Sequence, residues 1–314
     1  MHLLLPLTHI EAPLGPGWSR PLGLMPAGNG LVIEQLLFSA RKYLDLAAVF
    51  LGTGGAEAIA AASGAPYHIV PAGSNLWQTL LNCRELWSAG PVLLALGDAV
   101  IDADLGGLEN ISADATCFVH HPETGEDGAT LNVRDDSVVG EGGPWHASGM
   151  WWFRNGGTLA AVLHDLAGGA AADLTLGLVA RGVSVAARRS DLHVPLTGDK
   201  PAAERLLTLN HRLLGFGRSS DDAIERSYGE DFTVLTPVFI DDTATIDRAV
   251  VGPYTSVAAG ALVRGSVVGN SVIGRNAIVE DAVLDRAVVG EGAVVRGPRW
   301  SSWVADEAYR TLGA

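Results

Sequence analysis

An aspartate directly after an apolar run is the first feature of this sequence that could take part in chemistry. Asp98 stands in "LGDAVIDADL", behind the strand-like run "PVLLA". A carboxylate at the end of a buried strand either coordinates a cation or caps the backbone that follows it. Both interpretations stay open from the residues alone, whereas Asp104, later in the same stretch, is expected to cap the next segment.

Side chains that could neutralise a phosphate are scarce. The chain has two lysines, Lys42 and Lys200, so phosphate chemistry would have to depend mainly on arginine. Lys42 lies in a helical pattern and is expected to face solvent, while Lys200 follows Asp199. Arginine binds phosphate through a bidentate fork, so Arg20 and Arg134 are candidate phosphate ligands.

Two other kinds of site lack the residues that they need. His120, His121 and His146 are expected at strand ends or turns, and no further ligands follow at a spacing suited to zinc. Ser19 and Ser148 have no histidine and aspartate in a pattern that would indicate a hydrolase triad.

The composition limits the class of partner. Of the 314 residues 48% are hydrophobic, enough for a sizeable core. The formal net charge of −14 repels nucleic acid and anionic lipid, so neither is an expected partner. No apolar run reaches the roughly 18 residues of a membrane span. Cys83 and Cys117 form no disulfide framework, so a cytoplasmic protein is expected.

Strand-like and helix-like patterns alternate over residues 1–230. Short apolar runs closed by Gly, Pro or polar residues predict strands at "HLLLPL", "LAAVFLG", "YHIVPA", "PVLLALGD" and "ATCFVHH". Apolar residues at helical spacing in "LVIEQLLFSARKYL" and "NLWQTLLNCRELW" predict helices between them. Such alternation predicts an α/β domain with a Rossmann-like, mostly parallel sheet, in which ligands bind beyond the carboxyl ends of the strands.

A different texture covers residues 231–298. Aliphatic residues recur every five or six positions, at Ile240, Ile246, Val251, Val257, Val263, Val268, Ile273, Val279, Leu284, Val289 and Val295. This period indicates hexapeptide repeats and a short left-handed parallel β-helix, whereas a β-sandwich would place strands about 8–12 residues apart. No histidine occurs in "LVRGSVVGNSVIGRNAIVEDAVL", which argues against a hexapeptide acyltransferase. The tail, 299–314, returns to helical spacing and is expected to cap the β-helix.

The order of these two parts resembles the sugar-phosphate nucleotidyltransferases, such as the glucose-1-phosphate thymidylyl-, uridylyl-, adenylyl- and guanylyltransferases. "SRPLGLMPAGNGLVIEQLL" is similar to the family's proline-lysine segment, with Arg20 where the family usually has lysine. "LLALGDAV" matches its Gly-Asp strand end, "GSNLWQTLLNC" its Gly-Thr-Ala segment, and "SGMWWF" its Ala-Gly-Ile strand. "GDKPAAERLLTLNHRLL" resembles the segment in which an aspartate precedes Gly-Thr-Pro, although the Gly-Thr-Pro itself is replaced here by Pro-Ala-Ala.

The resemblance implies that a nucleoside triphosphate and a sugar phosphate react with release of pyrophosphate, with Mg²⁺ held by Asp98 and Asp199. It assigns phosphate chemistry to Arg20 and Lys200. The other implied residues fall into two groups: those that bind the nucleotide, Gly15, Gly17, Gly73, Ser74, Asn75 and Gln78, and those that bind the sugar phosphate, Arg134, Gly149 and Trp151.

Two departures from the family pattern leave a second hypothesis open. The expected Gly-rich loop reads "THIEAPLGPGW", in which Pro13 and Pro16 remove backbone donors and Glu11 adds a negative charge. The interval expected to contain Glu-Lys-Pro holds no lysine. The alternative is therefore a catalytically inactive homologue that senses a sugar nucleotide or acts as a regulatory or structural subunit. The resemblance also implies a homo-oligomer, or pairing with an active paralogue.

Overall fold

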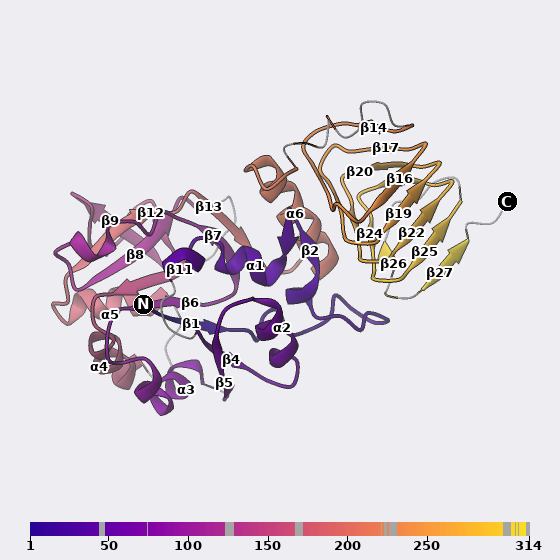
Figure 1. The fold of residues 1–314 in the computed structure, drawn as a ribbon. Coiled ribbons are helices and arrows are strands. Elements are labelled where there is room, and N and C mark those ends of the chain that lie inside the picture. The colour runs from indigo at the N-terminus through magenta and orange to yellow at the C-terminus, as the bar shows by residue number, and fades with distance from the viewer. Residues whose placement is uncertain are drawn as a thin grey trace. The chain divides into compact units, whose positions relative to one another are not determined.

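The computed structural model divides the chain into two units (Figure 1). It describes residues 1–43, 48–73, 75–122, 129–166, 172–220, 222, 225, 231–297, 303–304, 306 and 308–311. Unit 1 comprises Met1–Glu11 and Leu36–His193, and unit 2 comprises Ala12–Gln35 and Val194–Ala314. Neither unit is one continuous piece of chain, because the segment Ala12–Gln35 belongs with the C-terminal part.

Unit 1 is built around a mixed sheet of nine strands in the order β5-β4-β1-β6-β11-β8-β12-β10-β9. Its first four strands are parallel: β5 (Tyr67–Pro71), β4 (Ala48–Gly52), β1 (His2–Pro6) and β6 (Val92–Ala95). These are the strands expected from "HLLLPL", "LAAVFLG", "YHIVPA" and "PVLLALGD". The near-continuous apolar sequences of β4, β1 and β6 suit strands that are covered on both faces, whereas the edge strand β5 is only partly buried.

The remaining strands depart from the expected mostly parallel sheet. β11 (Trp145–Phe153) runs antiparallel to both β6 and β8 (Ala115–His120). β8 pairs with β12 (Val185–Arg189), which continues through β10 (Ser137–Glu141) to β9 (Thr130–Arg134). Because β9 also pairs with β11, these five strands close on themselves like a small barrel. The apolar runs predicted the strands but carried no signal for the direction of β11.

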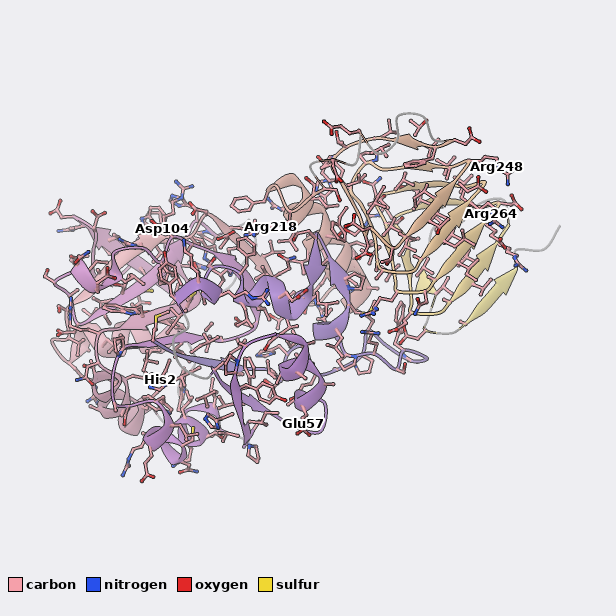
Figure 2. All side chains as sticks on the ribbon, in the orientation of Figure 1. His2, Glu57, Asp104, Arg218, Arg248 and Arg264 are labelled. Carbon is pink, nitrogen blue, oxygen red and sulfur yellow. The ribbon has the colours of Figure 1, made fainter. Side chains whose placement is uncertain are left out.

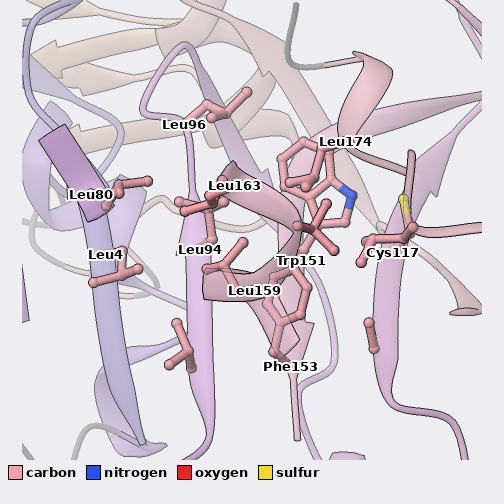
Figure 3. Packing of buried hydrophobic residues seen from close by; sticks show 14 of the residues in the cluster. Leu4, Leu80, Leu94, Leu96, Cys117, Trp151, Phe153, Leu159, Leu163 and Leu174 are labelled. Atoms are coloured by element: carbon pink, nitrogen blue, oxygen red, sulfur yellow. The ribbon is translucent and has the colours of Figure 1, made fainter. Parts of the chain in front are cut away.

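Three helices cover one face of this sheet: α3 (Leu76–Asn82), α4 (Gly156–Leu166) and α5 (Ala172–Ala180) (Figure 1). Their apolar residues join those of the strands in one buried cluster. Figure 3 shows Leu159 and Leu163 of α4 and Leu174 of α5 around Trp151, and Leu80 of α3 on the side of Leu4. The other short elements of unit 1 are α2 (Ala56–Ala62), the 3₁₀ turns Arg41–Tyr43, Arg84–Leu86 and Leu108–Asn110, and β7 (Ala99–Asp102), which pairs with β13 (Leu192–Pro195), a strand that begins in this unit.

Unit 2 contains the β-helix, made of three stacks of short parallel strands. The first stack is β14 (Thr233–Val234), β17 (Val250–Val251), β20 (Val267–Gly269) and β23 (Val283–Asp285). The second is β15 (Val238–Ile240), β18 (Thr255–Val257), β21 (Val272–Ile273), β24 (Val288–Val289) and β26 (Trp303–Val304). The third is β16 (Thr245–Asp247), β19 (Leu262–Arg264), β22 (Ile278–Glu280), β25 (Val294–Arg296) and β27 (Tyr309–Thr311).

The period-six pattern is confirmed by the register of these strands. All eleven aliphatic residues singled out in the sequence belong to the interior of the β-helix, ten of them buried and Ile246 partly buried. Val263, for example, stands level with Ile246 below it and Val279 above it. On the outer surface of the third stack, residues of opposite charge stand level with one another on neighbouring strands: Asp247, Arg264 and Glu280. Arg264, labelled in Figure 2, forms hydrogen bonds with both carboxylates.

The tail does not adopt the helix that its spacing suggested. Within its described residues, Trp303–Val304 and Tyr309–Thr311 are strands that extend two of the stacks by one rung each. Pairing with the open backbone edges of β24 and β25 satisfies more donors and acceptors than an isolated short helix would. The helix predicted over residues 31–44 is also shorter than expected, since α1 covers Val32–Leu37.

The second stack of the β-helix is covered by other parts of unit 2. α6 (Ala202–Gly215) and the hairpin of β2 (Pro26–Ala27) and β3 (Gly30–Leu31), which follows the 3₁₀ turn Leu22–Leu24, supply the covering residues. Asn210 of α6 is buried between them and bonds Gly28, Ser256 and Tyr254. Across the described residues of both units, no helix is long and apolar enough to cross a membrane.

Candidate functional site at the carboxyl edge of the parallel strands

The parallel strands of unit 1 create a point at which the chain reverses its direction across the sheet. From β1 the chain moves to β4 and then to β5, and it returns to place β6 on the other side of β1. The chain leaves β1 towards β4 and leaves β6 towards β8 on the opposite side, so these two connections diverge beyond the carboxyl ends of β1 and β6. In open α/β sheets, ligands bind at such a topological switch point.

Asp98 lies at this switch point. It follows β6 by three residues and is half-buried, and burial raises the pKa of its carboxyl group. The charge of the exposed His9, which follows β1, and a backbone hydrogen bond partly oppose that rise in pKa. A carboxylate that is desolvated in this way carries negative charge that the described protein groups only partly offset.

Gly149 of β11 fixes the surroundings of Asp98. Its carbonyl oxygen accepts a hydrogen bond of 2.9 Å from Leu96 N, and its φ of +84° lies in the left-handed region. A Cβ atom at this position would stand 3.1 Å from Asp98 Oδ1. Glycine is therefore required here both by the backbone and by the approach of the carboxylate.

The connection after β1 brings a carboxylate of the chain itself to the same edge. Glu11 Oε1 accepts a hydrogen bond of 2.6 Å from Thr53 N, and Glu11 Oε2 accepts one from the Thr53 hydroxyl. Thr53 follows the carboxyl end of β4 directly. The donors at the end of β4 are thus bound to Glu11, in a segment that the family resemblance assigns to phosphates.

Gly15, Gly17 and Arg20 belong to unit 2. Gly15 accepts a hydrogen bond from Trp18 N, so the two glycines form a turn, in which Gly17 has a φ of +83°. The guanidinium of Arg20 forms an ion pair with Glu291, and its Nε donates to the carbonyl oxygen of Leu24. The structure therefore binds Arg20 to the β-helix within unit 2.

The residues expected near the base lie between β5 and α3, at the carboxyl end of β5. Asn75 caps α3, since its Oδ1 accepts from Gln78 N at 3.1 Å. Gly73 N donates to Thr79 Oγ1 at 3.0 Å. Gly73 and Gln78 are exposed, and Ser74 lies outside the described residues. The segment therefore lies where the sequence predicted it, at the edge of the sheet that also bears Asp98.

The residues expected for the sugar phosphate are spread over unit 1. Arg134 ends β9 and is exposed beside a turn in which Asp135 and Asp136 both have positive φ. Trp151 is 1% exposed within the core, and its Nε1 donates to Thr175 Oγ1 (Figure 3). Of the three, Gly149 alone is brought next to Asp98 by a contact that the structure records.

Asp199 and Lys200 are exposed residues of unit 2, ahead of α6. Lys200 Nζ lies 3.7 Å from Glu204 Oε1, one helical turn further on. Asp98 belongs to unit 1, so the two expected metal ligands lie in different units.

Sequence reasoning missed a polar network inside unit 1. His120 Nδ1 lies 3.2 Å from Ser148 Oγ, which lies 3.0 Å from Ser190 Oγ. His193 stacks on His120 with 3.7 Å between ring centroids, and His146 meets the same ring edge-on. The alternation of His146 and Ser148 on one face of β11 was the available signal. Ser148 precedes Gly149, so the network adjoins the surroundings of Asp98.

Mg²⁺ is the metal that the family resemblance implies. Within the described part of the chain, no three His, Cys, Asp or Glu side chains are grouped so that they could hold a metal ion. Mg²⁺ in phosphate-transfer sites is commonly held by one or two carboxylates together with substrate phosphates and water. The desolvated carboxylate of Asp98 fits that requirement as a single protein ligand.

Comparison with known proteins adds no relative, since no family model and no curated protein sequence matches the chain. The likeness to the nucleotidyltransferases therefore rests on the motifs and on the order of an α/β unit and a β-helix.

Proposed function

We propose that this protein is a sugar-1-phosphate nucleotidyltransferase-like protein. It binds a nucleoside triphosphate and a sugar phosphate at the carboxyl edge of β5, β4, β1 and β6, and it joins them with release of pyrophosphate. The observation that carries the proposal is Asp98, a half-buried carboxylate with a raised pKa at the topological switch point between β1 and β6.

The electrostatics of Asp98 favour a cationic ligand. Burial penalises the charged carboxylate, and a divalent cation removes much of that penalty because opposite charges attract strongly where water is excluded. In the proposed complex Asp98 is the protein ligand of Mg²⁺, which substrate phosphates and water also bind, and the ion neutralises charge on the phosphates. Gly149 leaves room for the carboxylate and for the group that it binds.

The remaining roles follow the positions of the segments along the chain. Gly73, Asn75 and Gln78, at the carboxyl end of β5, are the proposed contacts of the base. Arg134, exposed at the end of β9, is the proposed contact of the sugar phosphate. Positioning and charge neutralisation provide most of the catalysis in phosphoryl transfer, so these residues need no covalent role.

A second candidate function is that of a non-catalytic homologue, which binds a nucleotide sugar as a regulatory or structural subunit. Two observations favour it: Glu11 binds the backbone and hydroxyl of Thr53, and Arg20 is paired with Glu291. In both places a carboxylate of the chain is bound to groups that a triphosphate would otherwise use. The two candidates share the binding edge and differ in the transfer step.

The experiment that tests the proposal measures pyrophosphate release with Mg²⁺ across the common nucleoside triphosphates and sugar 1-phosphates. We expect release for one pair, its loss in Asp98→Asn, and its retention in Asp104→Asn. Asp104 is a matched control because its carboxylate lies in the same stretch but bonds only Gly106 N among its recorded hydrogen bonds.

Two outcomes would count against transfer. If the wild type releases no pyrophosphate with any pair but a nucleotide sugar raises its melting temperature, the non-catalytic function is supported instead. If Asp98→Asn retains full activity, the role given to Asp98 is wrong.

A further inference from the structure

A carboxylate near the end of the chain is bound by a converging set of donors in unit 2. Asp306 Oδ2 accepts hydrogen bonds from Ser19 N at 3.0 Å, Ser19 Oγ at 3.0 Å and Arg20 N at 2.9 Å. Its other oxygen, Oδ1, accepts one from Glu291 N at 3.0 Å. Four donors from segments far apart in the sequence therefore surround one anionic group.

The donors are of the kind that binds phosphate. Successive backbone N–H groups that point at one place form an anion-binding concavity, and a serine hydroxyl adds a further donor. The contacts of Ser19 are exposed and Asp306 is only partly buried, so solvent reaches this place. A dissolved anion can therefore reach the donors that Asp306 now binds.

The charges around the donors also favour an anion. Arg20 and Arg275 lie close enough for their positive charges to interact, and burial together with Arg275 lowers the pKa of Arg20, whereas Asp306 raises it. Glu291 pairs with Arg20 and is the second negative group. Removal of Asp306 leaves the charges of Arg275 and Glu291 among the recorded interactions of Arg20, so the balance of charge around it becomes more positive.

We propose that the backbone and hydroxyl donors of Ser19, Arg20 and Glu291 form a binding site for a phosphate monoester, with Asp306 as an intramolecular competitor. The site needs neither Asp98 nor a metal, and its donor on Arg20 is the backbone N–H, not the guanidinium to which the family resemblance assigns phosphate chemistry. A ligand at this site displaces the Asp306 carboxylate from Ser19, Arg20 and Glu291, so ligand binding is coupled to the attachment of the C-terminal tail.

The competition sets the size of the expected effect. If Asp306 occupies the donors about 90% of the time or more, the apparent Kd of the wild type for phosphate is at least about tenfold weaker than that of an open site. Removal of the Asp306 carboxylate should restore that factor. A role limited to fastening the tail predicts instead a loss of stability with no gain in phosphate affinity.

The test is calorimetric titration of the full chain with inorganic phosphate at constant ionic strength, without nucleotide or metal. Three single variants are compared with the wild type: Asp306→Ala, Asp306→Asn and Asp285→Ala. Asp306→Asn keeps the size of the side chain and so remains informative if Asp306→Ala does not fold. Asp285→Ala is the control, because it changes the net charge equally at an exposed position of β23 in the same unit.

We expect both Asp306 variants to bind phosphate at least about tenfold more tightly than the wild type. Asp285→Ala should not, and adding Ser19→Ala to Asp306→Asn should weaken the binding again, because it removes the hydroxyl donor. Equal affinity of the wild type and both Asp306 variants would overturn the proposal, as would a gain that is unchanged by Ser19→Ala. Since Asp98→Asn should leave this binding unchanged, failure here is distinguishable from failure of the transferase proposal.

Discussion

The side chain of Asn210 connects α6 to the β2–β3 hairpin and to the β-helix in unit 2 through hydrogen bonds. Its side chain is 1% exposed. Asn210 Oδ1 accepts from Gly28 N at 2.8 Å and lies 2.7 Å from Ser256 Oγ, while Asn210 Nδ2 donates to Tyr254 O at 3.1 Å. One amide thus joins three segments, and Asn210→Ala removes every one of these bonds.

The magnitude follows from the groups that Asn210→Ala leaves behind. Ser256 Oγ keeps a second acceptor, the carbonyl oxygen of Gly28 at 2.9 Å. Gly28 N–H loses its recorded partner, and an unsatisfied buried donor costs about 1–3 kcal/mol. The lost bond to Tyr254 adds about 1 kcal/mol. We therefore expect a fall of about 2–4 kcal/mol in the free energy of unfolding of unit 2.

The assay is urea unfolding followed by circular dichroism, together with hydrogen exchange of the peptide that contains Gly28. Thr208→Ala is the matched control, since Thr208 is exposed on the same helix and its hydroxyl bonds only Glu204 O among its recorded hydrogen bonds. That change should stay within about 0.5 kcal/mol. In Asn210→Ala, exchange at Gly28 should become faster, because the donor is no longer bound.

A conservative variant separates lost hydrogen bonds from lost volume. Asn210→Asp keeps the shape, but a carboxylate faces the carbonyl oxygen of Tyr254, and burial should raise its pKa. A protonated carboxyl group can donate to that oxygen, so the deficit in stability should shrink as the pH falls. If Asn210→Ala unfolds within about 0.5 kcal/mol of the wild type, or no more easily than Thr208→Ala, the reasoning is refuted.

Two further predictions concern Asp98 and its surroundings. Burial raises the folded-state pKa of Asp98 above its ordinary 3.8, so the folded state binds more protons and loses stability as the pH rises through that range. Asp98→Asn should therefore be more stable than the wild type at pH 7. In melts at a series of pH values, that difference should vanish below about pH 3.8. Asp114 supplies the opposite sign, because hydrogen bonds from Ser184 lower its pKa: Asp114→Asn should destabilise the protein at pH 7 and lose that effect in acid, and two variants that respond alike would contradict both assignments. Gly149→Ala should destabilise the protein by about 1–2 kcal/mol because of the left-handed backbone, and by more because of the contact with Asp98. Gly182→Ala, with a φ of +75° and open space around it, should show the backbone effect alone. Equal melting temperatures of the two variants would show that the contact with Asp98 does not affect stability.

The Asp98 prediction also bears on the assay for function. A variant that folds at least as stably as the wild type but has lost pyrophosphate release has lost chemistry and not structure. Without that gain in stability, a loss of activity in Asp98→Asn would be open to the simpler explanation of unfolding.

Much of the candidate site was predictable because it follows the ends of strands. The apolar run before Asp98 predicted β6, and the switch point then follows from the order of the parallel strands. The segment from Gly73 to Gln78 was likewise expected beyond β5. The network of His120, Ser148 and Ser190 was not, because its members come from different strands and no spacing within one segment relates them.

The sequence by itself determined the elements whose pattern is local. The eleven aliphatic residues at the period-six positions, from Ile240 to Val295, lie in the interior of the β-helix, and their spacing along the chain is enough to predict the register of the strands. The parallel strands of unit 1 are equally local, since an apolar run bounded by turns contains the information for a strand.

Only the tertiary structure decided where the segment Ala12–Gln35 belongs. Its Ser19 bonds Asp306, 287 positions away, and its Arg20 pairs with Glu291, so a stretch read as phosphate-binding is attached to the β-helix within unit 2. A local pattern specifies which face of a strand or helix is apolar, but not which distant donor meets which carboxylate. That choice depends on how the folded chain brings its segments together, and it decides which anion Ser19 and Arg20 bind.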